Sequence, residues 1–114
     1  MPDEHPLCIY IDVDGTLVRT VGDKNLPDDA LVTRLREWRD QGAQLYCWSS
    51  RGADYARSIS KKLGIEACFV GFLTKPHVLV DDQGIERWAY FLELSPNRAA
   101  SLSLQQMRDK LDSA

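Results

Sequence analysis

LCIYIDVDGT, at residues 7–16, is the stretch that decides the fold. It begins with a continuous apolar run and ends with two aspartates, a glycine and a threonine. Such a run predicts a strand that is buried on both faces, which is typical of a parallel sheet covered by helices. Ligands of these sheets bind beyond the carboxyl ends of the strands. We therefore expect the functional site at Asp12 and Asp14.

Two more apolar runs end in polar residues in the same way. They are LYCW (45–48), followed by Ser49 and Ser50, and VLV (78–80), followed by Asp81 and Asp82. We expect both to be strands of the same sheet. Residues 68–70 also resemble a strand, but a helical crossover from there to Val78 would need a dozen residues or more. An extended linker of about seven residues spans roughly 23 Å, which is enough to cross the sheet without a helix. The pattern of residues 88–94 does not decide between a strand and a short helix.

Three helices are predicted from caps and apolar periodicity. The first begins at Pro27 and ends before Gly42, the second ends at Gly64, and the third begins at Ser103 with a capping box. The expected fold class is α/β, a three-layer Rossmann-like parallel sheet with helices on both faces, in one domain spanning residues 1–114. The buried helix positions are Leu31, Leu35, Trp38, Ala56, Ile59, Leu63, Leu104, Met107 and Leu111.

Composition excludes several classes of protein. No apolar run approaches the ~20 residues of a membrane helix, and residues 1–6 lack the basic and apolar parts of a secretory signal, so we expect a cytoplasmic protein without a membrane partner. The net charge of −3 disfavours nucleic acid as a partner. The three cysteines have no zinc or redox spacing and are expected to be buried free thiols: Cys8, Cys47 and Cys68.

Asp12 and Asp14 stand two residues apart, so at a strand end their side chains point to one side. One carboxylate can attack a reacting group while the other carries the proton of the leaving oxygen. Gly15 permits a tight turn, and Thr16 adds a hydroxyl. The simplest alternative is a strand that ends in an ordinary Asp-Gly turn. An EF-hand fits poorly because glycine stands fourth in the motif instead of sixth.

An anionic substrate at two carboxylates requires positive charge. Lys75 can supply it, Ser49 can donate a hydroxyl hydrogen bond, and the helix that follows Ser49 can point its N-terminus at the same place. Asp81 and Asp82 would complete an oxygen-rich site for Mg²⁺.

Together these residues resemble the haloacid dehalogenase superfamily of phosphohydrolases. Residues 12–16 match its first motif, Ser49 its second, Lys75 its third and the pair at 81–82 its fourth, in the family's order. The resemblance implies a HAD-like fold with Asp12 as the nucleophile, Asp14 as the general acid and base, and a phosphoryl group held by Ser49 and Lys75. Ser50 and Arg51, directly after Ser49, are further candidates for binding the substrate.

The resemblance also implies a Mg²⁺ ion held by Asp12, the main-chain carbonyl of Asp14, and the acidic pair, with Asp82 favoured over Asp81 as the direct ligand. Dehalogenases of the family lack a carboxylate at the position of Asp14, so a phosphatase is the better interpretation. Arg51 is as well explained by a solvated surface position as by a substrate contact.

The intervals between the motifs are too short for a cap domain, which predicts an open site. An open site suits a phosphate on a large or projecting substrate, such as a protein, a polysaccharide precursor or a nucleic-acid end. A small substrate stays open as well, with a lid supplied by residues 17–26 or by another copy of the chain. The alternative function is a phosphate-binding or regulatory module without catalysis. A receiver domain is disfavoured because its lysine follows its acids.

Overall fold

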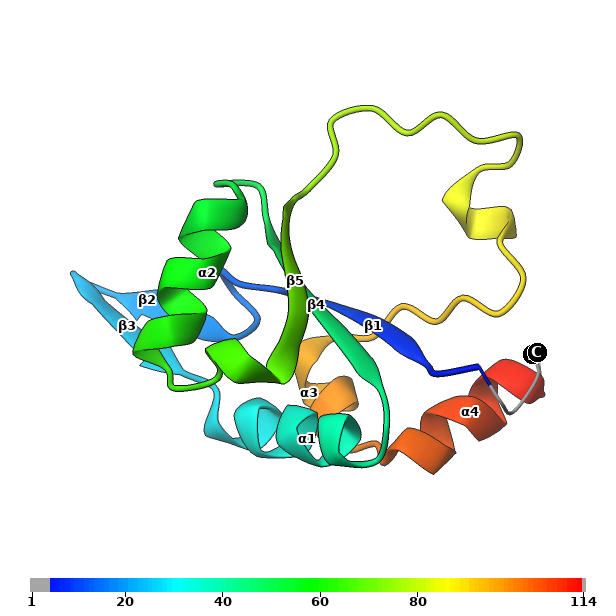
Figure 1. Cartoon of the computed structure of the whole chain (residues 1–114), viewed down its shortest axis with the longest axis horizontal. Coiled ribbons are helices and arrows are strands. Elements are labelled where there is room, and N and C mark those ends of the chain that lie inside the picture. The colour runs from blue at the N-terminus through cyan, green and yellow to red at the C-terminus, as the bar shows by residue number, and fades with distance from the viewer. Residues whose placement is uncertain (1–4, 114) are drawn as a thin grey trace.

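A three-stranded parallel sheet with the order β1-β4-β5 forms the centre of the molecule (Figure 1). The structure is a computed structural model that describes residues 5–113. Residues 1–4, on which part of the secretory-signal expectation rests, lie outside the described range, as does residue 114. The strands are β1 (Cys8–Asp12), β4 (Gln44–Ser49) and β5 (Phe69–Thr74), so the strands expected near residues 7, 45 and 68 are confirmed.

Two helices connect these strands and cover one face of the sheet. They are α1 (Asp29–Asp40), between β1 and β4, and α2 (Ala53–Lys62), between β4 and β5. Both connections step in the same direction along the sheet, so right-handed crossovers place both helices on the same face. Side chains alternate along β4 accordingly, and Leu45, Cys47 and Ser49 are at most 1% exposed. The hydroxyl of Ser60 in α2 donates to the Cys47 sulfur across this layer, at 3.6 Å.

The opposite face of the sheet is only partly covered. Tyr10 stacks on Tyr46 with 5.0 Å between ring centroids, and the ring of Trp48 meets Tyr10 edge-on at 5.0 Å. Tyr10 is 47% exposed. The sequence predicted helices on both faces of the sheet. Tyrosine and tryptophan rings carry a polar group and tolerate partial exposure to solvent, so an apolar run that contains them does not require a helix over this face.

The helix ends follow the predicted caps with one shift. Asp28 is the N-cap of α1, and its Oδ1 accepts the amide of Leu31 at 3.0 Å. Pro27, which was expected in the first turn, is the last residue of the preceding strand. Gly64 has a φ angle of 74°, the left-handed conformation expected where the second helix ends, and Gly42, after α1, has a φ of 101°.

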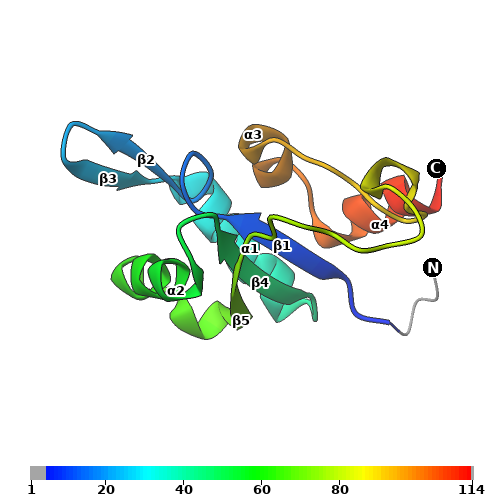
Figure 2. The ribbon, with the colours of Figure 1, turned by 90° about the horizontal axis from the view of Figure 1, so that it is seen from above.

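A β-hairpin occupies the interval that the sequence left as a loop. It consists of β2 (Val18–Val21) and β3 (Lys24–Pro27), joined by a two-residue turn in which Gly22 has a φ of 63°. A glycine-containing dipeptide between two short extended runs is the sequence signal for such a hairpin. The hairpin projects away from the sheet beside α2 (Figure 2).

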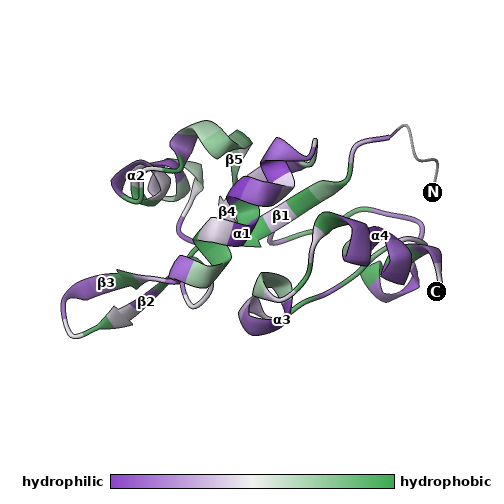
Figure 3. Cartoon of the chain, turned by 90° about the horizontal axis from the view of Figure 1, so that it is seen from below, coloured by the Kyte–Doolittle hydropathy of each residue, from purple (hydrophilic) through white to green (hydrophobic). Residues whose placement is uncertain are grey.

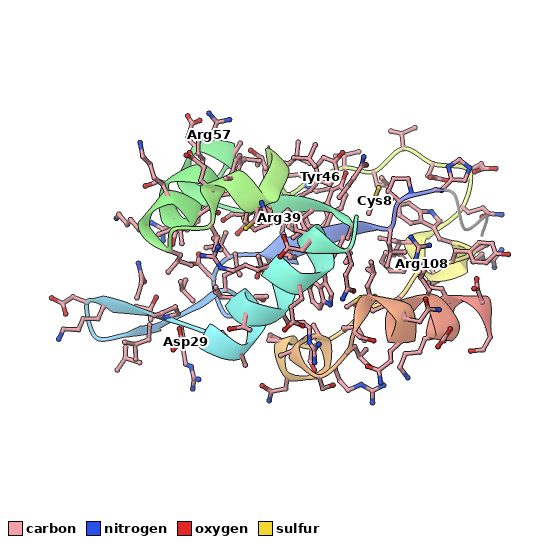
Figure 4. The ribbon with its side chains drawn as sticks, turned by 60° about the horizontal axis from the view of Figure 1, so that its bottom comes forward. Cys8, Asp29, Arg39, Tyr46, Arg57 and Arg108 are labelled. Carbon is pink, nitrogen blue, oxygen red and sulfur yellow. The ribbon has the colours of Figure 1, made fainter. Side chains whose placement is uncertain are left out.

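The C-terminal part of the chain packs beside α1 and β1. It contains α3 (Pro96–Ala100), which the sequence analysis missed, and α4 (Leu104–Asp112), which has the predicted capping box at Ser103. The indole nitrogen of Trp38 in α1 donates to the carbonyl of Leu102 at 2.9 Å, which ties the segment between α3 and α4 to the core. Arg108 of α4 donates to the carbonyl of His5 at 3.2 Å, next to the start of β1 (Figure 4).

The predicted strand at residues 78–80 is wrong. These residues belong to a wide, irregular arc that leads from β5 to α3 and contains only the short turn η2 (Ile85–Arg87) (Figure 1). Val78 and Val80 are 78% and 94% exposed. Because β5 continues to Thr74, only three residues precede Val78, too few for a crossover back to the start of the sheet. Residues 88–94 form neither a strand nor a helix.

The core lies between the sheet and its helices. Apolar residues follow the strands, while the outward turns of α1 and α4 are mainly hydrophilic (Figure 3). Cys47 and Cys68 are buried, as expected; Cys68 closes η1 (Glu66–Cys68). Cys8 is exposed, so the expectation of a buried thiol is wrong there. Within residues 5–113, no helix has the length and apolar character needed to cross a membrane.

Candidate active site

Asp12 and Lys75 meet at the carboxyl end of the sheet. Nζ of Lys75, which directly follows β5, lies 3.2 Å from Oδ1 of Asp12, the last residue of β1. The other carboxylate oxygen of Asp12, Oδ2, accepts the hydroxyl of Thr16 at 3.3 Å. The side chains of Asp12 and Lys75 are 28% and 39% exposed, so solvent and a ligand can reach the pair. A cation is therefore present where the sequence required one.

The turn after Asp12 is shaped by Gly15. Its φ of 78° is a left-handed conformation, and its amide donates to the carbonyl of Val18 at 2.8 Å. The amide of Thr16 donates to the carbonyl of Val13 at 3.1 Å. Glycine adopts this backbone without strain, and the closed turn holds the Thr16 hydroxyl beside Asp12.

Ser49 lies at the end of β4, between the two outer strands. It is 1% exposed, and its Oγ accepts the amide of Arg51 at 3.0 Å. Its carbonyl accepts the amides of Gly52 and Lys75, at 3.1 and 3.0 Å. These bonds fix the start of α2 and the end of β5 relative to each other. Because the hydroxyl accepts from Arg51, its own proton takes no part in that bond.

Asp14 is held by two side chains of the segment that begins α2. The hydroxyl of Tyr55 donates to Oδ1 of Asp14 at 2.7 Å, and Nη1 of Arg51 lies 3.9 Å from Oδ2. The guanidinium of Arg51 also stacks over the Tyr55 ring, 3.9 Å from its centroid. Burial, followed by the hydrogen bond to the Asp14 carboxylate, raises the pKa of Tyr55, so its hydroxyl stays protonated as a donor near neutral pH.

The acidic pair lies outside this group. Asp81 and Asp82 are exposed on the arc between β5 and α3, and Oδ1 of Asp81 accepts the amide of Gln83 at 2.9 Å. That backbone hydrogen bond is the main cause that lowers the pKa of Asp81. In the described part of the chain, no three His, Cys, Asp or Glu side chains gather where they could hold a metal ion. Ser50, expected to touch substrate, is exposed at the turn after β4.

A cavity of about 300 Å³ adjoins Asp12 along β1. Asp12, Thr16 and Lys75 form its polar end, and the rest of its wall is mainly apolar and aromatic. Residues of the apolar wall include Tyr10, Trp48, Leu92, Leu94 and Met107.

Tyr55 is a member of the site that was not predicted from the sequence. Tyr55 and Asp14 are 41 positions apart, and no motif joins them. One signal was present: Tyr55 stands near the start of a helix that follows a motif serine, which places it at the same edge of the sheet.

Comparison with known proteins adds support for the fold alone. No family model matches the chain, and no curated protein matches it. Among solved structures, the chain is similar to an MCSG target from Vibrio cholerae, with a TM-score of 0.56 and 19% sequence identity, over 94% of this chain and 98% of the other. At this level of identity the similarity shows a shared fold, and the description of that protein names no function.

Proposed function

We propose that the chain is a HAD-like phosphatase that cleaves a phosphate monoester through an aspartyl-phosphate on Asp12. The observation that carries the proposal is the contact of 3.2 Å between Lys75 and Asp12. A lysine at this place supplies the positive charge that an attacking carboxylate needs when its target is a phosphate dianion. The order of the sequence motifs supports the same assignment, independently of the geometry.

The proposed reaction has two steps. The Asp12 carboxylate attacks phosphorus, the bond from phosphorus to the ester oxygen breaks, and Asp14 gives its proton to the leaving oxygen. Asp14 then takes a proton from water, which attacks the aspartyl-phosphate and releases inorganic phosphate and the free Asp12 carboxylate. Lys75 and the hydroxyl of Ser49 hold the phosphoryl oxygens, with Ser50 and Arg51 nearby.

Mg²⁺ is part of the proposal. Mg²⁺ in phosphoryl-transfer sites needs only one or two carboxylates, together with phosphate oxygens and water, and the Asp12 carboxylate with the Asp14 main-chain carbonyl suits that donor set. When bound, the ion would neutralise charge on the phosphoryl oxygens. We include Asp81 and Asp82 as ligands on the sequence resemblance alone, because they can reach Asp12 only if the exposed arc moves.

The substrate is proposed to be a phosphate on a projecting or macromolecular group. The contact pair is open to solvent, and the cavity beside it offers an apolar wall to the group that carries the phosphate. A second copy of the chain that covers the open side would restrict the site to smaller substrates.

One observation favours a second candidate, a phosphate-binding module without turnover. The acidic pair does not gather with Asp12 and Asp14 in the described structure. Such a module would bind phosphate at Lys75 and Ser49 but release no product. Calorimetry with phosphate or vanadate, combined with product assays, separates the two functions.

The test of the main proposal uses purified protein, Mg²⁺ and p-nitrophenyl phosphate. We expect release of p-nitrophenol that chelator abolishes and that Asp12→Asn reduces by at least about 10³-fold. Asp23→Asn, in the exposed turn of the hairpin, is the matched control and is expected to retain activity. Activity of Asp12→Asn equal to that of the unchanged protein would refute the proposal.

A further inference from the structure

Tyr55 and Asp14 form the shortest side-chain contact between α2 and the turn after β1. The Tyr55 hydroxyl donates to Oδ1 of Asp14 at 2.7 Å, a distance typical of a strong hydrogen bond from a hydroxyl to a carboxylate. Tyr55 is the third residue of α2, so the helix fixes its position. Asp14 therefore has a partner on a rigid element, although it lies in a turn.

Arg51 limits the movement of this pair from the other side. Its guanidinium lies over the Tyr55 ring at 3.9 Å, and its Nη1 approaches Oδ2 of Asp14 at 3.9 Å. The main chain of Arg51 is fixed in turn, because its amide donates to the buried Ser49 hydroxyl. The next residue, Gly52, has a φ of 111°, which lets the chain turn sharply into α2. Ring, guanidinium and carboxylate thus restrain one another.

The restraint matters because the Asp14 side chain is 42% exposed. An exposed aspartate on a turn samples several rotamers, and only some of them present an oxygen to a leaving group. Misplacement of a catalytic group by about 1 Å can cost on the order of 10²-fold in rate. A hydroxyl that holds Oδ1 leaves Oδ2 as the oxygen that can carry the proton.

We propose that Tyr55 is a positioning residue that holds the Asp14 carboxylate for proton transfer to the leaving group, with Arg51 fixing the Tyr55 ring. The inference rests on the proposed function, since it assigns a supporting residue to the proposed general acid. In this role Tyr55 acts on the reaction through Asp14, its hydrogen-bond partner. Its effect should therefore depend on how much the leaving group needs a proton.

The test compares two aryl phosphates of similar shape. Phenolate is a poor leaving group that needs protonation, whereas p-nitrophenolate leaves with little help. We expect Tyr55→Phe to lower kcat/KM, which reports the steps up to departure of the leaving group, about tenfold or more on phenyl phosphate and less than about twofold on p-nitrophenyl phosphate. Asp14→Asn should show the same dependence on the leaving group, and adding Tyr55→Phe to it should cause no further loss.

Tyr90→Phe is the matched control, because Tyr90 is 51% exposed on the arc between β5 and α3. It should leave both rates unchanged. An equal loss of kcat/KM on both substrates, or no loss on either, overturns the role of Tyr55 while the Asp12-dependent activity of the unchanged protein upholds the proposed function. If the unchanged protein has no activity that depends on Asp12, the proposed function and this inference fall together.

Discussion

Nζ of Lys75 lies 3.2 Å from Oδ1 of Asp12. Asp12 ends β1 and Lys75 follows β5, so the contact joins two strands that β4 separates in the sheet. The contact passes over the end of β4, where Ser49 is buried. Side chains from the two outer ends of the sheet, Asp12 and Lys75, thus converge at a single place. Parallel order is what makes this convergence possible, because all three strands end at the same edge.

Replacing Lys75 by methionine should reduce catalysis much more than stability. Lys75→Met keeps most of the side-chain volume but removes the charge, so we expect kcat/KM for p-nitrophenyl phosphate to fall about 10²-fold or more. The ion pair is partly exposed, so the free energy of unfolding should change by less than about 1 kcal/mol. Lys62→Met, at the exposed end of α2, is the control. Unchanged kcat/KM in Lys75→Met would remove Lys75 from the site.

Mg²⁺ binding distinguishes the two parts of the proposed ligand set. Isothermal titration in the presence of phosphate should show that Asp12→Asn abolishes binding of Mg²⁺ and that Asp82→Asn weakens it about tenfold or more. Asp23→Asn should bind Mg²⁺ as the unchanged protein does. Equal affinity in Asp82→Asn would restrict the protein ligands to the end of β1, with the exposed arc taking no part.

Substitution of two valines tests whether residues 78–80 form an exposed arc and not a buried strand. Val80 is 94% exposed and Val13 is fully buried. Val80→Ala should change the free energy of unfolding by less than about 0.5 kcal/mol, whereas Val13→Ala should cost about 1–3 kcal/mol, measured by urea denaturation. A loss in Val80→Ala as large as that in Val13→Ala would mean that this segment packs as a buried strand in solution.

Local signals predicted the central sheet and most helix ends well. The apolar run before Asp12, the left-handed Gly64 and the Ser103 capping box each depend on neighbours within a few residues. For the same reason the sequence placed Asp12 and Ser49 correctly at strand ends. These features need no knowledge of distant contacts.

The errors arose where the outcome depends on distant parts of the chain. The run at 78–80 has the composition of a strand, but pairing requires a connection of suitable length, and the extension of β5 to Thr74 left too little. Tyr55 could not be assigned because its partner is brought to it only by the crossover through α1 and β4. Composition specifies what a segment can become, and topology decides what it does become.

The aromatic face of the sheet gives the candidate site a fluorescent probe of its own. The Trp48 ring lies 5.9 Å from Nζ of Lys75 and lines the cavity beside Asp12. Trp38 borders the same cavity but is 1% exposed, and Trp88 lies just beyond η2. An anion that draws Lys75 away from this indole changes the electric field around it. The emission of the unmodified protein thereby becomes a direct readout of occupancy, with no label attached.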